Sequence, residues 1–216
     1  MIDSASKSNR ASDVIERQIH RMIITLELAP GMMVSEAELM QRLKCGRPPL
    51  REALQRLTQE YLIISVPRKG VYIAELNLPD YFQLIEAVAH LESLAASLAA
   101  ERATETEIGE LEKIIEATAK ASDADNILEI VEQDYNFHQK MARYGRNRYI
   151  LDMTARLHHL TSRFIYLAMK NGLKTGVSLD EHREIVDAIR ARDKETAGKC
   201  TYTHTIHAKE RIIAKL

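Results

Sequence analysis

The sequence predicts a mainly α-helical chain of two domains, with β structure confined to one short hairpin. Three observations support this prediction. Apolar residues recur at helical spacing over most of the 216 residues. Two short β-type runs, residues 62–66 and 71–74, flank a Pro-Arg-Lys-Gly turn at residues 67–70. After Leu78 there is no convincing strand pattern, and Ala, Leu, Glu and Ile dominate.

The first two helices are marked by periodicity and by end signals. A helix is predicted over residues 13–28, because Pro30-Gly31 ends the pattern and apolar residues before it share one helical face. The apolar residues are Val14, Ile19, Met22, Ile23 and Leu26. Ser35 and Glu38 have the spacing of a capping box, which predicts a short helix through residues 39–43. Residues 1–12, rich in Ser, Asn, Lys and Arg, are expected to form a flexible arm.

The third helix is predicted from the segment GRPPLREALQRL, residues 46–57. Apolar residues form one stripe, Leu50, Leu54, Leu57 and then Tyr61, while Arg47, Arg51 and Gln55 step by four along another face. Two prolines are tolerated because they fall in the first turn. This turn is the positive end of the helix dipole and attracts phosphate, and an arginine there is placed to pair with guanine in a major groove. The alternative is that the arginines form an ordinary solvated face.

Three helices followed by a basic hairpin is the order of a winged helix-turn-helix. Residues 42–69 hold seven Lys or Arg against two acids, a basic patch suited to duplex DNA. The predicted DNA-contacting residues are Lys44, Arg47, Pro48, Arg51 and Gln55 around the third helix, with Arg68, Lys69 and Gly70 in the wing.

Length and charge distribution agree with a chain of two domains. We predict a DNA-binding domain over residues 13–75, a linker over 76–80 and an all-helical domain over 81–216. Residues 1–75 carry a net charge of +2 and residues 76–216 a net charge of −3, so only the first part suits a polyanion. Two cysteines suggest no disulfide framework, and neither a signal peptide nor an 18-residue apolar run is present. We expect a cytoplasmic protein that does not bind membranes.

The second domain is predicted to be a bundle of six helices. Residues that start and stop helices place them at about residues 79–103, 105–121, 125–144, 148–170, 179–191 and 194–214.

A candidate metal site lies in this bundle and consists of Asp134, His138, His182 and His204. Asp134 and His138 are four residues apart, so their side chains project from one helical face. His182 and His204 lie eleven residues on either side of the turn at Asp193, which places two inward-facing imidazoles at the same height of a helical hairpin. Three imidazoles and one carboxylate suit Zn²⁺ or Ni²⁺ with open coordination positions. The adjacent His158 and His159 lie on a different helix, so at least one must face away from this site; we expect them at the surface or behind the metal ligands.

Other readings of this site stay open. A metal-dependent hydrolase is the least favoured, because the sequence has no HExxH helix, phosphate loop or nucleophile elbow. Asp134 would be occupied as a metal ligand, which leaves no obvious general base. We therefore expect that the protein is not an enzyme. The ion could instead be the signal itself, as in a metal sensor, or it could be a structural staple, an ion that only stabilises the fold.

At these motifs the chain resembles the GntR family of transcription regulators, FadR subfamily. The resemblance runs from Asp13 onward and rests on VSEAELMQRL, on GRPPLREALQRL and on YLIISVPRKGVYI. In that family the recognition helix typically opens with Ser-Arg-Thr-Pro-Val-Arg-Glu-Ala-Leu; here Gly46 replaces the Ser and Pro48 the Thr. Ala37 stands where some members have another DNA-contacting arginine.

The resemblance implies roles for particular residues. Arg47 and Arg51 would be the principal DNA contacts, and Gly70 would enter the minor groove. The second domain is similar to the FCD ligand-binding domain in its shorter, VanR-type form of six helices, which commonly carries the Asp-x3-His and single-histidine pattern found here. The implied protein is a homodimeric, effector-responsive regulator of operator DNA, most often a repressor, whose effector is often an organic acid. Val88 replaces an arginine that pairs with carboxylate effectors in many members.

Overall fold

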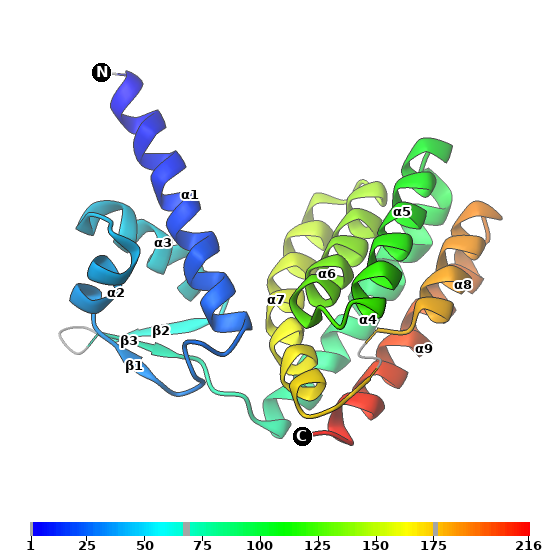
Figure 1. Cartoon of the computed structure of the whole chain (residues 1–216). Helices are drawn as coiled ribbons and strands as arrows, with labels where there is room; N and C mark the ends of the chain where they lie inside the picture. The colour runs from blue at the N-terminus through cyan, green and yellow to red at the C-terminus, as the bar shows by residue number, and fades with distance from the viewer. Residues whose placement is uncertain (1, 67–69, 175–176) are drawn as a thin grey trace. The chain divides into compact units, whose positions relative to one another are not determined.

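The computed structural model describes residues 2–66, 70–174 and 177–216. The chain divides into two compact units, Met1–Leu76 and Asn77–Leu216, each described by itself below. The predicted fold class is confirmed, because a three-helix unit with a small sheet is followed by an all-helical unit (Figure 1). No helix among the described residues is long and apolar enough to cross a membrane.

The first unit contains α1 (Ile2–Ile24), α2 (Glu36–Leu43) and α3 (Arg47–Gln59) together with a three-stranded sheet. The strands are β1 (Met33–Val34), β2 (Ile63–Val66) and β3 (Gly70–Ile73). The sheet order is β1-β3-β2 and both pairings are antiparallel, with Val34 opposite Val71 and Val66 opposite Gly70. This is a winged helix-turn-helix in which β2 and β3 form the wing.

The sequence did not reveal β1, because two residues are too short to show alternation. Gly70 explains why this strand can pair so closely with the wing. Its φ is +119°, and an added Cβ would lie 2.8 Å from the carbonyl oxygen of Val34. Any other residue at this position would strain the backbone and collide with β1.

Two features of the first unit differ from the sequence pattern. Helix α1 begins at Ile2 and so includes residues 2–12, which contain no Gly or Pro, and propagating a formed helix costs little. Tyr61 does not extend the apolar stripe of α3. The helix ends at Gln59, and Tyr61 has a φ of +59° and is 65% exposed. Within α1, Val14 lies off the buried face and Ile15 is buried instead.

The second unit is the predicted bundle of six helices. They are α4 (Leu78–Arg102), α5 (Glu105–Asp123), α6 (Ile127–Tyr144), α7 (Arg148–Lys170), α8 (Leu179–Arg190) and α9 (Lys194–Ile213). Asn77 caps α4 by accepting a hydrogen bond from the backbone N–H of Asp80. Most of the predicted linker at 76–80 therefore belongs to the first turn of α4, and the boundary between the units lies after Leu76.

Helices α4 and α9 run antiparallel and pack closely against each other. The hydroxyl of Ser97 donates to the carbonyl oxygen of Lys194, and about one and a half turns earlier on α4 the carboxylate of Glu92 accepts from Thr205. An added Cβ at Gly198 would collide with the hydroxyl of Ser97 and lie 3.2 Å from the carbonyl oxygen of Ser93, so Ser97 would have to rotate away from its hydrogen bond with Lys194. This close packing fixes the height at which side chains of α4 and α9 face each other.

Candidate recognition helix and metal centre

The recognition helix α3 presents its predicted DNA-contacting side chains to solvent. Buried Leu50, Leu54 and Leu57 anchor one face in the first unit, together with Ala53. On the opposite face the side chains of Arg47 and Arg51 are 62% and 63% exposed. Gly46 caps the helix without a side chain, and Pro48 and Pro49 have no N–H, so Arg47 is the residue of the first three that has a backbone N–H to offer a phosphate.

Glu36 of α2 orients both arginines. Its carboxylate accepts from Nε of Arg51 at 3.0 Å and lies 3.8 Å from Nε of Arg47. A guanidinium held through Nε keeps its terminal nitrogens available, and those are the donors that a guanine edge requires. Glu36 was not identified from the sequence, although an acid in the first turn of α2 is a signal that could have been weighed.

The other predicted DNA-contacting residues are distributed as follows. Lys44, Pro48 and Gln55 are exposed around α3, and Gly70 begins β3. Arg68 and Lys69 lie outside the described residues. Arg56, counted in the basic patch, instead binds Asp13, Glu16 and Glu52 and ties α1 to α3.

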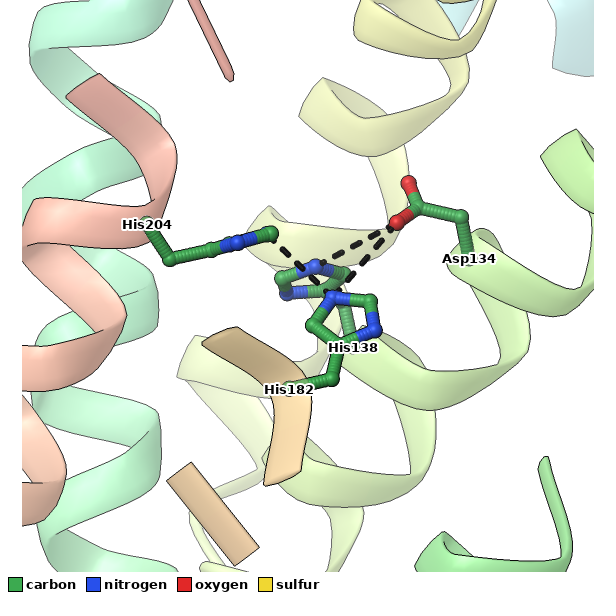
Figure 2. A group of neighbouring side chains, drawn as sticks. All are labelled: Asp134, His138, His182 and His204. Carbon is green, nitrogen blue, oxygen red and sulfur yellow. Dashed lines mark hydrogen bonds and ion pairs between the residues drawn. The ribbon is translucent and has the colours of Figure 1, made fainter. Parts of the chain in front are cut away.

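The four predicted metal ligands meet in the interior of the bundle (Figure 2). Asp134 and His138 project from α6, His182 from α8 and His204 from α9, and all four are buried. Nε2 of His182 lies 3.2 Å from Nε2 of His204 and 3.7 Å from Oδ1 of Asp134, which is 3.8 Å from Nε2 of His138. Ligands of one ion at about 2.1 Å lie roughly 3.0–3.4 Å apart, so these spacings fit a single divalent ion after small adjustments.

The hydrogen-bonding partners of the histidines support the same interpretation. Nδ1 of His204 lies 2.9 Å from the Oε2 of Glu181, which also accepts from Arg211 at 2.9 Å. A carboxylate behind the ring selects the tautomer whose Nε2 lone pair faces the site. Burial and the neighbouring charges of His204 and His138 lower the pKa of His182 well below its usual range, which keeps this imidazole neutral. The imidazole lone pairs that face Asp134 create a site suited to a cation.

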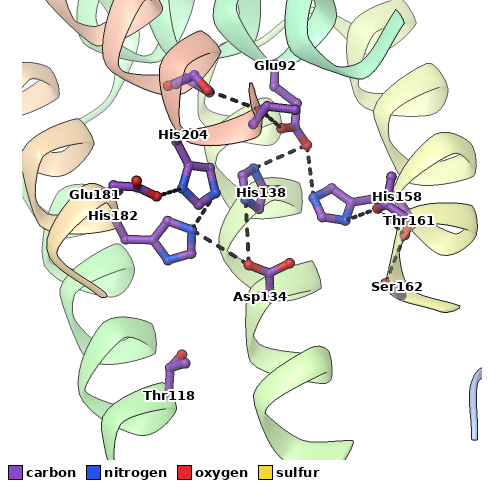
Figure 3. Close-up of polar contacts among 12 residues, drawn as sticks. Glu92, Thr118, Asp134, His138, His158, Thr161, Ser162, Glu181, His182 and His204 are labelled. Carbon is purple, nitrogen blue, oxygen red and sulfur yellow. Dashed lines mark hydrogen bonds and ion pairs between the residues drawn. The ribbon is translucent and has the colours of Figure 1, made fainter. Parts of the chain in front are cut away.

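Glu92 and His158 form a second layer beside the ligands (Figure 3). Oε1 of Glu92 lies 3.2 Å from Nδ1 of His138 and 2.9 Å from Nε2 of His158. Burial alone would raise the pKa of Glu92, but the charges of His138 and His158 hold it well below its usual range. Burial would likewise lower the pKa of His138, and Glu92 raises it instead.

Sequence reasoning underestimated these two residues. His158 is buried and shares a face with Thr161 and Ile165, whereas the adjacent His159 is only partly buried and contacts the hydroxyl of Tyr135. Glu92 lies on an otherwise apolar face of α4. A carboxylate within a buried stripe was the signal that could have identified it.

A cavity of about 30 Å³ adjoins the ligands. Asp134, His138 and His204 line one end, and its remaining walls come from α4, α7 and α9. Val88, where many members of the resembled family have an arginine, is part of the wall. A void of this size holds about one water molecule.

Comparison with known proteins identifies both domains. Residues 11–73 match the model of the gntR family of bacterial regulatory proteins, and residues 83–207 match the FCD domain. The chain is 31% identical to the HTH-type transcriptional repressor NanR of Citrobacter rodentium, with 90% of this chain and 82% of that protein covered. It is 27% identical to the uncharacterized HTH-type transcriptional regulator YdhC of Bacillus subtilis, over 90% and 88% of the two chains.

Two solved structures share the fold. McbR/YncC of E. coli superimposes with a TM-score of 0.83 at 18% identity, covering 94% of this chain and 97% of that one. A GntR-type regulator from Rhodococcus superimposes with a TM-score of 0.77 at 19% identity, covering 98% and 99%. The relatives are transcriptional regulators rather than enzymes. This chain therefore belongs to the GntR family, and it is a DNA-binding transcriptional regulator whose C-terminal unit is an FCD domain.

Proposed function

We propose that this regulator is a homodimeric repressor whose bundle binds one divalent metal ion and a small-molecule effector, and that effector binding changes its affinity for operator DNA. The observation that carries the proposal is the convergence of Asp134, His138, His182 and His204 beside a buried cavity. The donor set suits Zn²⁺ or Ni²⁺. These four side chains would hold the ion, which supplies an open coordination position for an oxygen of the effector.

Dimerisation follows from the requirements of DNA recognition. One recognition helix contacts only a few base pairs, so two copies are needed for useful affinity and specify a palindromic operator. Spacing between the two recognition helices then becomes the quantity that an effector can alter.

Helix α4 connects the effector site to DNA binding. Tyr81, Ile85 and Val88 of α4 line the cavity, and the helix begins at Leu78, directly after the DNA-binding unit ends at Leu76. An occupant that displaces α4 acts on the segment joined covalently to the recognition unit. By linkage, operator DNA must change effector affinity by the same factor.

The test begins with an operator duplex selected by the metal-loaded protein from a randomised pool. Operator affinity is then measured with and without compounds that raise the melting temperature in a ligand screen. His138→Ala should abolish the response to such a compound while effector-free DNA binding remains largely intact. His90→Ala is the matched control, because His90 is exposed on α4. A full response in His138→Ala would contradict the proposal that the effector acts through this site.

A metal sensor is the second candidate, and the small cavity favours it, since about 30 Å³ leaves room for little more than a water molecule. In that case, returning Zn²⁺ or Ni²⁺ to chelated protein changes operator affinity with no organic ligand present. An ion that alters melting temperature but never operator affinity would instead be a structural staple.

A further inference from the structure

A larger cavity of the second unit is lined by α6 and by the turns that follow α5 and α7. Its volume is about 300 Å³, whereas the cavity beside the metal ligands has about 30 Å³. None of the four candidate metal ligands is among the described residues that line it. A space of this size is at the lower end of the range of small-molecule sites.

The floor of this cavity is apolar and its mouth carries charges. The buried and partly buried part of its lining consists of apolar side chains, Ile127, Ile130, Met169 and Leu173. The exposed part includes Asp125 and Lys174. An occupant would therefore place an apolar group on the floor and its polar groups at the mouth.

The main chain holds the two charged positions in place. In each turn a backbone N–H donates to a carbonyl oxygen five residues earlier, Asn126 to Ala121 after α5 and Leu173 to Ala168 after α7. This hydrogen bond is typical of a Schellman motif, which ends a helix and fixes the direction of the following chain. Both sides of the mouth are therefore built without help from an occupant.

An adjoining cavity of about 280 Å³ connects this space with the surroundings of the metal ligands. The two cavities share lining residues, namely Ser122, Ile130, Met169 and Lys174. Arg211 lines the adjoining cavity and donates to Glu181 at 2.9 and 3.0 Å. The same carboxylate lies 2.9 Å from Nδ1 of His204. The cavities thus reach the hydrogen bonds behind a candidate metal ligand without containing one.

The charges around the two cavities balance, but one group of each sign has no partner. Both arginines of the adjoining cavity already have acidic partners, Arg183 with Asp180 at 2.7 Å and Arg211 with Glu181 at 2.9 Å. Asp125 and Lys174 form no ion pair with any residue that the structure describes. With histidines neutral, an occupant with a net charge would leave one charge uncompensated. An occupant with one charge of each sign matches both unpaired groups.

We infer that this space is a binding site for an α-amino acid with an apolar side chain. The carboxylate of the ligand pairs with Lys174, its ammonium group pairs with Asp125, and its side chain covers Ile130 and Met169. The site does not include the metal ion, so the inference goes beyond the proposed function and does not depend on it.

The probes are L-leucine, L-isoleucine, L-valine and L-methionine, and their binding to full-length protein is measured by calorimetry and by thermal shift. We expect at least one of them to bind. Its analogues without the ammonium group or without the carboxylate should each bind about tenfold more weakly, because each loses a charge-assisted contact. For leucine these analogues are isocaproate and isoamylamine. Glycine should also bind more weakly, because it has no side chain to cover the apolar floor.

Two variants assign each charge of the ligand to its partner. Asp125→Asn, which suits the φ of +51° at this position, should weaken binding of the amino acid but not of the analogue without the ammonium group. Lys174→Gln should weaken binding of the amino acid but not of the analogue without the carboxylate. Asp123→Asn and Lys170→Gln are the matched controls, because both residues are exposed at helix ends and line neither cavity.

Three results would overturn the inference: no binding of any of the four amino acids, an analogue that binds within twofold of its amino acid, or an unchanged affinity in either variant. His138→Ala separates this site from the candidate metal centre and should bind the amino acid as the parent does. Loss of binding in His138→Ala together with full binding in Asp125→Asn would place the ligand at the metal centre and exclude the site proposed here.

Discussion

Replacing Arg47 with alanine should lower operator affinity far more than it lowers nonspecific DNA binding. A bidentate contact of arginine with guanine is worth about 1–3 kcal/mol of discrimination. In the free protein the same side chain lies 3.8 Å from Glu36 and is 62% exposed, and an exposed ion pair of this kind contributes roughly 0–1 kcal/mol. The DNA contact therefore dominates, and we expect a loss of about five- to 150-fold.

Fluorescence anisotropy with a selected operator duplex and a scrambled duplex, at one salt concentration, measures both affinities. Arg42→Ala is the control, because it removes the same charge from the same unit while Arg42 pairs with Glu27. The melting temperature of Arg47→Ala should match the parent, since an exposed substitution changes stability by less than about 0.5 kcal/mol. Unchanged operator affinity in Arg47→Ala would refute the assignment of α3 as the sequence-reading element.

Two further predictions concern stability. Gly70→Ala should lower the free energy of unfolding by about 1–3 kcal/mol, because the new Cβ would meet the Val34 carbonyl at a positive φ; an unchanged urea midpoint would contradict the close pairing of β1 with the wing. Burial alone would raise the pKa of Glu107, but the N–H of Thr104 and the guanidinium of Arg146 hold it below its ordinary value. A depressed pKa stabilises the fold above the unfolded value near 4.5 and this contribution is lost as pH falls, so the destabilisation caused by Glu107→Gln should shrink below about pH 4.5. An equal destabilisation at pH 3 and pH 7 would refute that linkage.

Local patterns were sufficient for most of the fold. The six bundle helices begin and end within a few residues of their predicted limits because each is bounded by a side-chain cap or a turn, such as Asn126, Asn147 and Ser178. Tyr61 shows where periodicity alone fails. It continues the spacing of the apolar stripe, but the chain reverses at a positive φ two residues after α3 ends.

Part of the candidate metal site could likewise be predicted from the sequence, and part could not. His182 and His204 could be paired from the sequence, because equal distances from a helical turn fix their relative height, and their Nε2 atoms lie 3.2 Å apart. The contact between Glu92 and His158 could not be predicted from the sequence, since it depends on how α4 and α7 are rotated about their axes against α6. Sequence spacing does not determine which of two adjacent histidines faces inward.

The cavity beside the candidate metal ligands depended still more on tertiary packing. That Val88 replaces an arginine could be noted from the sequence, but the set of residues that line the cavity became visible only once the helices were packed together. The buried hydroxyl of Tyr81 has no hydrogen-bond partner among the described residues, and no local pattern predicts this burial.

The most direct test of the proposed metal centre is the metal content of the purified protein, measured by plasma mass spectrometry beside thermal unfolding. The account predicts one divalent ion per chain in the parent and none in the double variant His182→Ala, His204→Ala, with the melting temperature of chelated parent falling toward that of the variant. Full metal occupancy in the double variant, or a parent that neither contains nor takes up Zn²⁺ or Ni²⁺, would contradict it.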